Sequence, residues 1–284
     1  MGLIGIGLVG SALAERWHSA GWQTVGFDLD PQKRQFLQNL VGRVAGSIEE
    51  VARSAEVIVL SLPTSEIAAS VVASILDMLA GKIVVDTTTG EPDEMIAIGA
   101  AVAQRDGEYL DATIAGSSAQ VRSGEAIVIA GGLAQTVATV DPLLRTFATQ
   151  VFHVGPCGAG ARMKLVVNLV LGLNRAVLAE GLSFARRCGI DPSQALEVLR
   201  AGPAFSQVMT IKGTKMLEGD FTPQARLAQH LKDVRLILSA GMIHGATLPL
   251  STLHAELLDP LASSLIRRSK QILRNSLCLK GTRT

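Results

Sequence analysis

The chain has 284 residues, of which 48% are hydrophobic and 18% charged, and its formal net charge is +1. This apolar composition predicts a globular protein with a large core, and the near-neutral charge gives no general attraction to nucleic acid or to a membrane surface. Three scattered cysteines form no C-x-x-C pair, so we expect neither a disulfide framework nor a metal site, and a reducing compartment.

The N-terminus and the longest apolar stretch indicate where the protein works. The chain opens directly on MGLIGIG, without the basic and apolar regions of a signal peptide, so we expect a cytoplasmic protein. The apolar stretch 163–185 is interrupted by charged side chains such as Lys164, Arg175 and Glu180. It therefore predicts a buried helix rather than a membrane span.

Short apolar, β-branched runs alternate with stretches of helical length through the first 157 residues. The runs predict strands at 3–6, 24–27, 57–62, 82–85, 108–111, 126–130 and 151–154. Amphipathic stretches at 11–20, 66–80 and 94–104 predict helices between them. The alternation indicates a mostly parallel sheet covered on both faces, an α/β domain of the Rossmann type.

The pattern changes after Gly160, where only helical periodicity is found. We therefore divide the chain into a dinucleotide-binding domain, 1–157, and an all-α C-terminal domain, 158–284, that begins with a long interdomain helix. The high apolar content suggests further surface buried between subunits, and a homo-oligomer, a dimer or a tetramer, is expected.

The first strand leads into the string IGIGLVGSALAERW, whose glycines Gly5, Gly7 and Gly10 form a G-x-G-x-x-G frame. In a strand-turn-helix setting these glycines allow a tight turn, a close approach of a pyrophosphate and close packing of helix on strand. Leu8 and Val9, within the turn, are expected to contact the cofactor, and the N-terminal N–H groups of the helix that follows would meet the phosphates. The turn therefore predicts a dinucleotide site.

The second strand ends at Asp28, 23 residues after Gly5. An acid there would accept hydrogen bonds from the adenosine ribose, and its charge favours NAD over NADP. The alternative is an acid at a helix N-terminus, since Asp30 and Pro31 follow. Lys33 and Arg34 could also turn toward a 2′-phosphate.

Two later loops follow apolar strands at the carboxyl edge of the predicted sheet, where ligands of such folds bind. The loop SLPTSE carries Leu62 and Pro63, and the loop DTTTGEP carries Thr88 and Thr89. We predict that these four residues contact the cofactor. The alternative for the two threonines is to cap a helix that begins near Pro92.

Lys164 and Asn168 lie four residues apart in an otherwise apolar region, after a glycine-rich hinge. This spacing places both side chains on one helical face, about one turn apart. The pair is either a partly solvated helix face, with the lysine reaching water, or part of a substrate site at a domain junction.

Four separated motifs, within about the first 260 residues, resemble the β-hydroxyacid dehydrogenases, typified by 3-hydroxyisobutyrate dehydrogenase and tartronate semialdehyde reductase. They are GIGLVG (5–10), DATIAGSSAQVRSGEA (111–126), GPCGAGARMKLVVN (155–168) and FTPQARLAQHLKD (221–233). The second is similar to the family's substrate loop, and the third carries its lysine and asparagine.

The resemblance implies roles for individual residues. Lys164 matches the general acid/base and Asn168 its partner. The family's substrate-binding positions correspond here to Ala115, Gly116 and Ser117, together with Lys164, Asn168 and Lys232, and Lys232 is also expected near the cofactor. Gly116, Ser117 and Lys232 would hold the substrate carboxylate.

The chain also departs from the family pattern. Ala115 stands where the family usually has a carboxylate-binding serine, and Ser117 and Gln120 stand where it has glycines. Thr113 replaces a proline and Ala225 an aromatic residue. The family's acidic C-terminal segment is absent, and the basic stretch 261–284 takes its place.

The expected protein is thus an NAD(P)-dependent oxidoreductase that interconverts a small 3-hydroxy acid and its semialdehyde. Two alternatives remain: an NAD-binding sensor on the same scaffold, and a related imine reductase, which normally lacks the lysine. The expected partners are a small substrate with a carboxylate and further copies of the chain, without nucleic acid or membrane.

Overall fold

The computed structural model describes residues 1–40, 43–220 and 227–259, apart from the side chain of Ala228. They fall into two compact units, Met1–Lys164 and the residues from Leu165 onward. The predicted domain boundary after residue 157 lies just before helix α8, Ala159–Arg187, which runs through the division between the units. That boundary stays a prediction.

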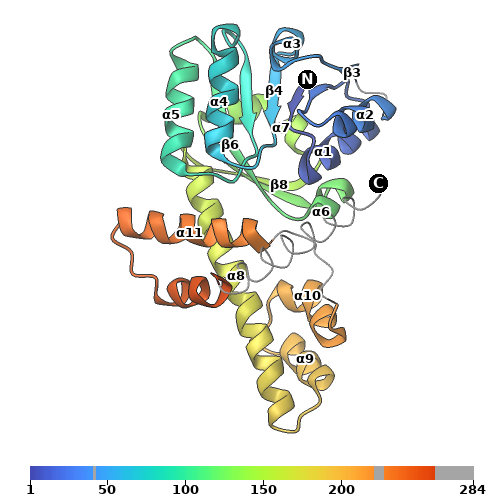
Figure 1. Cartoon of the computed structure of the whole chain (residues 1–284), viewed down its shortest axis with the longest axis vertical. Coiled ribbons are helices and arrows are strands. Elements are labelled where there is room, and N and C mark those ends of the chain that lie inside the picture. The colour runs from blue at the N-terminus through green and yellow to red at the C-terminus, as the bar shows by residue number, and fades with distance from the viewer. Residues whose placement is uncertain (41–42, 221–226, 260–284) are drawn as a thin grey trace, which may run out of the picture. The chain divides into compact units, whose positions relative to one another are not determined.

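The first unit is built on one eight-stranded sheet in the order β3-β2-β1-β4-β5-β6-β7-β8 (Figure 1). All neighbouring strands pair in parallel except β6 and β7. The predicted Rossmann-type sheet is therefore confirmed. The strands are β1 Gly2–Ile4, β2 Val25–Phe27, β3 Arg43–Val44, β4 Val57–Leu60, β5 Ile83–Asp86, β6 Glu108–Ala115, β7 Ala126–Gly131 and β8 Ala148–Gly155.

Two features of the sheet differ from the pattern read from the sequence. The two-residue strand β3 was not predicted, because Arg43–Val44 is too short to show a period. Strand β6 continues to Ala115, four residues past the predicted end, and pairs antiparallel with β7. Only ten residues separate these strands, too few for the long crossover that a parallel pair requires.

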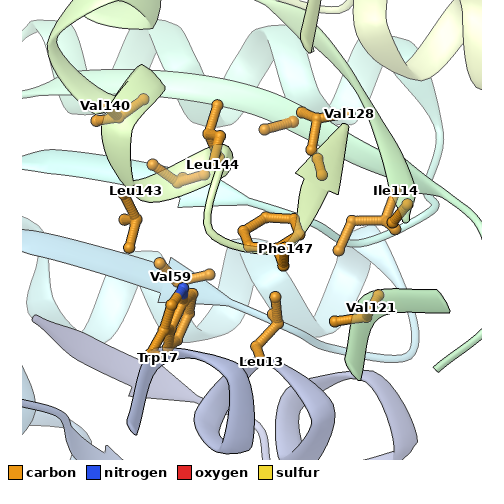
Figure 2. Packing of buried hydrophobic residues seen from close by; sticks show 14 of the residues in the cluster. Leu13, Trp17, Val59, Ile114, Val121, Val128, Val140, Leu143, Leu144 and Phe147 are labelled. Carbon is orange, nitrogen blue, oxygen red and sulfur yellow. The ribbon is translucent and has the colours of Figure 1, made fainter. Parts of the chain in front are cut away.

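Helices cover both faces of the sheet and bury two separate cores. On one face, α1, α6 and α7 pack Leu13, Trp17, Val121 and Leu144 around Phe147 (Figure 2). On the other face, α3, α4 and α5 supply the apolar residues. The helices of this unit are α1 Leu8–Ser19, α2 Pro31–Asn39, α3 Ile48–Ser54, α4 Ser65–Ile75, α5 Pro92–Ala103, α6 Ser118–Ser123 and α7 Ala134–Leu144, with a 3-10 turn at Leu76–Met78.

Every regular element in the described part of the second unit is a helix, as predicted. It contains the greater part of α8, then α9 Pro192–Ala201, α10 Gln207–Glu218, α11 Leu227–Ile243 and a helical segment at 249–259. Its small core joins α8, α9 and α10 through Leu178, Leu182, Leu196, Val208 and Met209.

Helix α8 is less buried than the sequence predicts. Its side chains Val166, Val170, Val177 and Phe184 are all at least half exposed. By length and composition the helix could cross a membrane, and only 22% of its most apolar window is buried. The expected buried helix is therefore wrong for the single chain, because the described part of the chain leaves one apolar face of α8 uncovered.

Candidate functional site

The glycine-rich turn joins β1 to α1 at the carboxyl edge of the sheet. Gly5 has φ +92°, and a Cβ there would lie 2.3 Å from the Ser61 carbonyl oxygen. A Cβ on Gly10 would lie 2.0 Å from the Gly5 carbonyl oxygen, whereas one on Gly7 would meet nothing within 4 Å. The first and third glycines thus let backbones approach, and the second leaves an open side.

Helix α1 begins without a side-chain cap. Its N-cap is Gly7, which provides no side-chain cap, and the first turn of the helix contains no acidic residue. Leu8 is exposed and Val9 half-buried beside it. N–H groups left without an internal partner at a helix N-terminus are suited to an anion such as a phosphate.

Asp28 follows β2 and closes on the glycine-rich turn. Its carboxylate accepts hydrogen bonds from the backbone N–H of Ile6, at 2.6 Å, and of Asp30, at 2.9 Å. The helix that follows is capped by Asp30, whose side chain accepts from the Gln32 N–H. Asp30 is therefore the cap of α2, while Asp28 lies just before that helix with its carboxylate beside the turn.

The neighbouring basic side chain Arg34 is held by the backbone. Its guanidinium donates to the carbonyl oxygens of Asp28, at 2.6 Å, and Leu29, at 3.1 Å. Its Cζ also lies 5.6 Å from the centre of the Phe27 ring, within cation–π range. These contacts occupy Arg34 in the structure.

The loops after β4 and β5 are joined by Thr88. Its hydroxyl accepts a hydrogen bond from the Leu62 N–H at 3.3 Å, and its own N–H donates to Asp86 at 2.8 Å. The N-cap of α5 is Glu91, and no side chain caps that helix. Thr88 therefore joins the two loops and does not cap α5. Pro63, next to Leu62, is exposed, and Thr89, next to Thr88, is half-buried.

The loop after β6 contains the predicted substrate segment. Ala115 ends the strand half-buried, Gly116 is exposed, and Ser117 caps α6. The Ser117 hydroxyl accepts from the Gln120 N–H at 3.3 Å, and the Gln120 side chain accepts from the Ser117 N–H at 2.9 Å. This capping box accounts for the two departures at positions 117 and 120 by local hydrogen bonding.

Asp111 anchors the N-terminus of α8, although the sequence did not single it out as a site residue. Its buried carboxylate accepts from the backbone N–H of Gly158, at 2.8 Å, and of Ala161, at 2.7 Å. A Cβ on Gly160 would lie 2.4 Å from the Asp111 carbonyl oxygen. Burial raises the pKa of Asp111, and the backbone donors oppose that rise. The start of the helix that carries Lys164 is thereby fixed to the sheet.

Thr113 strengthens the same attachment. The side chain is fully buried, and its hydroxyl lies 3.3 Å from the Ile129 carbonyl oxygen and 3.4 Å from that of Gly160. A proline, the family's usual residue here, has no hydroxyl for these contacts. The substitution therefore fits this packing.

Lys164 and Asn168 lie one turn apart on α8. Lys164 is 8% exposed, unusual for a lysine, and Asn168 is half-buried. Within the helical unit, the Asn168 amide donates to Asp233 at 3.1 Å, and the ammonium of Lys232 lies 3.6 Å from the other Asp233 oxygen. Burial lowers the pKa of Lys232, and the charge of Asp233 opposes this.

Sequence reasoning missed the linking role of Asp233. It belongs to the quoted motif FTPQARLAQHLKD, but its contact with Asn168 spans 65 positions. The position Ala225 and the basic stretch 261–284 lie outside the described residues.

Two family models match the chain in succession. Residues 1–155 match the NAD binding domain of 6-phosphogluconate dehydrogenase, and residues 158–272 match the NAD-binding domain of NADP-dependent 3-hydroxyisobutyrate dehydrogenase. The first match alone spans more than half of the chain.

Individual relatives agree with these matches. A probable 3-hydroxyisobutyrate dehydrogenase-like protein of Arabidopsis thaliana is 30% identical over 85% of this chain and 82% of its own length. The 2-hydroxy-3-oxopropionate reductase of Escherichia coli is 26% identical over 93% and 91%. The solved structure of Mycobacterium tuberculosis 3-hydroxyisobutyrate dehydrogenase with L-serine superposes with a TM-score of 0.86, at 23% identity, over 92% of this chain and 93% of that one.

Proposed function

Because the chain belongs to the β-hydroxyacid dehydrogenase family, we propose that it interconverts a small 3-hydroxy acid and its semialdehyde, with Lys164 as the general acid/base. The chain is an NAD(P)-dependent oxidoreductase of this family. The observation that carries the proposal for Lys164 is its near-complete burial on α8, a helix whose start is fixed to the sheet by Asp111.

The residues of the glycine-rich turn fit a dinucleotide. Gly7 has open space where its side chain would be, and the uncapped N-terminus of α1 offers backbone N–H groups beside it. Gly5, Gly10, Leu8 and Val9 shape this turn, and Leu62, Pro63, Thr88 and Thr89 lie in the loops after β4 and β5. When bound, the nicotinamide would accept or supply the hydride.

We expect NAD to be preferred over NADP. Asp28 places a carboxylate beside the turn, where a 2′-phosphate would meet like charge, while Arg34 is held by two carbonyl oxygens. Comparing kcat/KM for the two cofactors measures the preference. A tenfold preference for NADPH would contradict the assignment.

The substrate class follows from the groups available to a carboxylate. In this proposal the backbone at Ala115, Gly116 and Ser117, together with Lys232, binds the acid group of the substrate. A relative of this chain is named a 2-hydroxy-3-oxopropionate reductase, and that compound carries a carboxylate. Equal turnover of uncharged alcohols of the same size would contradict carboxylate binding.

Lys164 performs the proton transfer in both directions. During oxidation its neutral amine accepts the hydroxyl proton of the substrate, and during reduction its ammonium returns the proton to the carbonyl oxygen. An amine suits this role because the same group can accept one proton and later return it. Asn168, held by Asp233, would orient the hydroxyl without adding charge.

Two substitutions of Lys164 test this role. Lys164→Ala should lower kcat by about 10²- to 10⁴-fold, the usual contribution of a general acid/base. Lys164→Arg should fail nearly as severely, because a guanidinium does not release its proton near neutral pH. Measurements of kcat, the NAD dissociation constant and the melting temperature on each variant separate catalysis from folding.

Lys82→Ala is the matched control. The Lys82 ammonium donates to the Ala55 carbonyl oxygen at 2.7 Å, so its loss should reduce stability and leave kcat nearly unchanged. Near-normal turnover by Lys164→Arg would reject the catalytic role and leave Lys164 as a structural residue. Reduction of imines but not semialdehydes, or cofactor binding without any turnover, would favour the imine reductase or the sensor instead.

The remaining parts of the proposal concern assembly and location. We propose a homo-oligomer in which a second copy covers the exposed apolar side chains of α8, since uncovered apolar stripes mark association surfaces. A soluble protein in the cytoplasm, without nucleic acid or membrane as partner, is the setting that this proposal implies.

A further inference from the structure

A second polar cluster lies entirely within the helical unit. A Cβ on Gly172 of α8 would lie 3.0 Å from Cε1 of His230, on α11, and 3.0 Å from Cε1 of His254, in the segment 249–259. The two imidazole rings have their centres 5.2 Å apart. Both histidine rings therefore pack against Gly172, which has no side chain, and His254 is only 8% exposed.

Arg175 lies one turn further along the same face of α8. Its Nε is buried, and among the residues that the structure describes it has no hydrogen-bond partner. A buried donor without a partner costs about 1 to 3 kcal/mol, and more when the group is charged. An arginine is therefore held in this cluster with part of its hydrogen-bonding capacity unused.

The surroundings of these side chains are positive. Burial lowers the pKa of Arg175, and burial together with the charge of Arg175 lowers the pKa of His254. Burial, Arg175 and His254 lower the pKa of His230 to about 4. Arg175 also acts on Lys212 of α10, whose pKa is lowered by burial and by the charges of Arg175 and Lys215. No acidic side chain contributes to these shifts in Arg175, His230 or His254.

A cation is a poor occupant of such a cluster. Within the described ranges, no group of three or more His, Cys, Asp or Glu side chains could hold a metal ion. The arginine charge would also repel one. Guanidinium and imidazole N–H groups are donors, and the group that satisfies donors of this charge is an oxyanion.

We propose that Arg175, His230 and His254 form a binding site for an oxyanion, namely the phosphate, phosphonate or carboxylate group of a small molecule. Arg175 supplies a permanent charge and a forked set of donors, and the two imidazoles add donors that become cationic when the anion binds. Lys212 adds a further positive charge at the α10 side. The site uses none of the residues assigned to proton transfer, and its existence does not depend on the proposed reaction.

Sulfate is a suitable probe, because its charge stays constant where imidazoles titrate. The ring ε1 protons of His230 and His254 are followed by NMR across a pH series, with sulfate and with chloride at matched ionic strength. His230→Asn and His254→Asn assign the signals. Because a bound anion stabilises the imidazolium, sulfate should raise the pKa of both histidines in a saturable way.

Arg175→Met and Arg186→Met form the matched pair of variants. Both remove one arginine charge from α8, but Arg186 lies exposed three turns further on. Arg175→Met should weaken sulfate binding at least tenfold, and Arg186→Met should leave it within twofold. The wild-type measurement decides the proposal even if Arg175→Met does not fold.

Turnover measurements with sulfate decide whether the oxyanion belongs to the substrate or to a separate ligand. If it is a second acid group of the substrate, sulfate competes with diacid substrates and not with monoacids, and Arg175→Met raises KM for diacids alone. If it is a separate ligand, sulfate affects both substrate classes alike. The proposal is overturned if sulfate leaves both histidine pKa values where chloride does, or if Arg186→Met abolishes the effect as fully as Arg175→Met.

Discussion

The two units of this chain differ in how completely they bury their apolar side chains. In the sheet unit, apolar side chains from helices on both faces close two cores around β strands, and large residues such as Trp17 and Phe147 are almost fully buried (Figure 2). In the helical unit, a small core joins α8, α9 and α10, while one stripe of α8 remains exposed.

The polar interiors differ in the same way. The sheet unit buries the carboxyl groups of Asp86 and Asp111, and each accepts hydrogen bonds from backbone N–H groups or a tyrosine hydroxyl. The helical unit gathers Arg175, His230 and His254, and among the described residues no acidic side chain contributes to the shifts in their pKa values. The buried carboxyl groups of the sheet unit thus find their partners within that unit, whereas the buried Nε of Arg175 in the helical unit has no hydrogen-bond partner among the described residues.

The largest expected effect is a loss of stability of the sheet unit when a side chain is added in its glycine-rich turn. Gly10→Ala puts a Cβ 2.0 Å from the Gly5 carbonyl oxygen, a backbone atom that cannot move away cheaply. Overpacking of this kind costs about 1 to 3 kcal/mol or more, so we expect a clear loss in the free energy of unfolding. Denaturant unfolding measures it.

Gly7→Ala is the matched control on the same turn. Its Cβ would meet nothing within 4 Å, and its φ of −75° suits alanine. Stability should change by less than about 0.5 kcal/mol, while the methyl group obstructs the proposed pyrophosphate and raises the dissociation constant of NAD. Unchanged NAD affinity in a folded Gly7→Ala protein would argue against phosphate binding at this turn.

The second prediction addresses the uncovered stripe of the helical unit. Val166, Val170, Val177 and Phe184 are spaced by four, seven and seven residues, which places them on one face of α8. Val177→Asp should weaken association of the chains by at least about tenfold, because a carboxylate would be buried without a partner. Sedimentation over a range of protein concentrations measures the change.

Leu29→Asp provides the comparison in the sheet unit. Leu29 is 84% exposed, more than the 67% of Val177, but it lies in the loop between β2 and α2 rather than on a periodic stripe. Leu29→Asp should therefore leave the association of the chains unchanged. A wild-type chain that remains monomeric at all concentrations would reject the oligomer and leave the stripe to another partner.

The third prediction concerns how the stability of each unit changes with pH. Burial raises the pKa of Asp86 and Asp111, so the folded sheet unit binds protons at higher pH than the unfolded chain and gains stability from these groups as pH falls. The pKa of His230 falls from 6.5 to about 4, so the helical unit loses stability as pH falls through that window.

Hydrogen exchange in chloride buffer, corrected for intrinsic rates, should therefore show protection falling first in α11 and 249–259 between pH 6.5 and 4. The strands β4, β5 and β6 should retain their protection longer. His230→Asn should narrow the difference in protection between the two units. Equal loss of protection in both units would contradict the opposite signs assigned to the two sets of groups.

Much of the fold and part of the site could be predicted from local sequence. Apolar alternation predicted the strands other than β3 and the helices α1, α4 and α5, because an element's period shows which residues share a face. The positions of Gly5, Gly7 and Gly10 predicted a strand-turn-helix junction, and at Gly5 and Gly10 only glycine tolerates the backbone contacts found there. The four-residue spacing of Lys164 and Asn168 was enough to place both on one face of a helix.

Tertiary structure alone decided the contacts that join distant segments. Asp111 reaches Gly158 and Ala161 across about 50 positions, Asp233 reaches Asn168 across 65, and His230 meets His254 against Gly172. No periodicity within one element encodes such pairs, because which faces meet depends on how whole elements pack. The sequence by itself therefore determined most of the strands and the glycine-rich turn, while packing decided how α8 is anchored and which charges gather beside it.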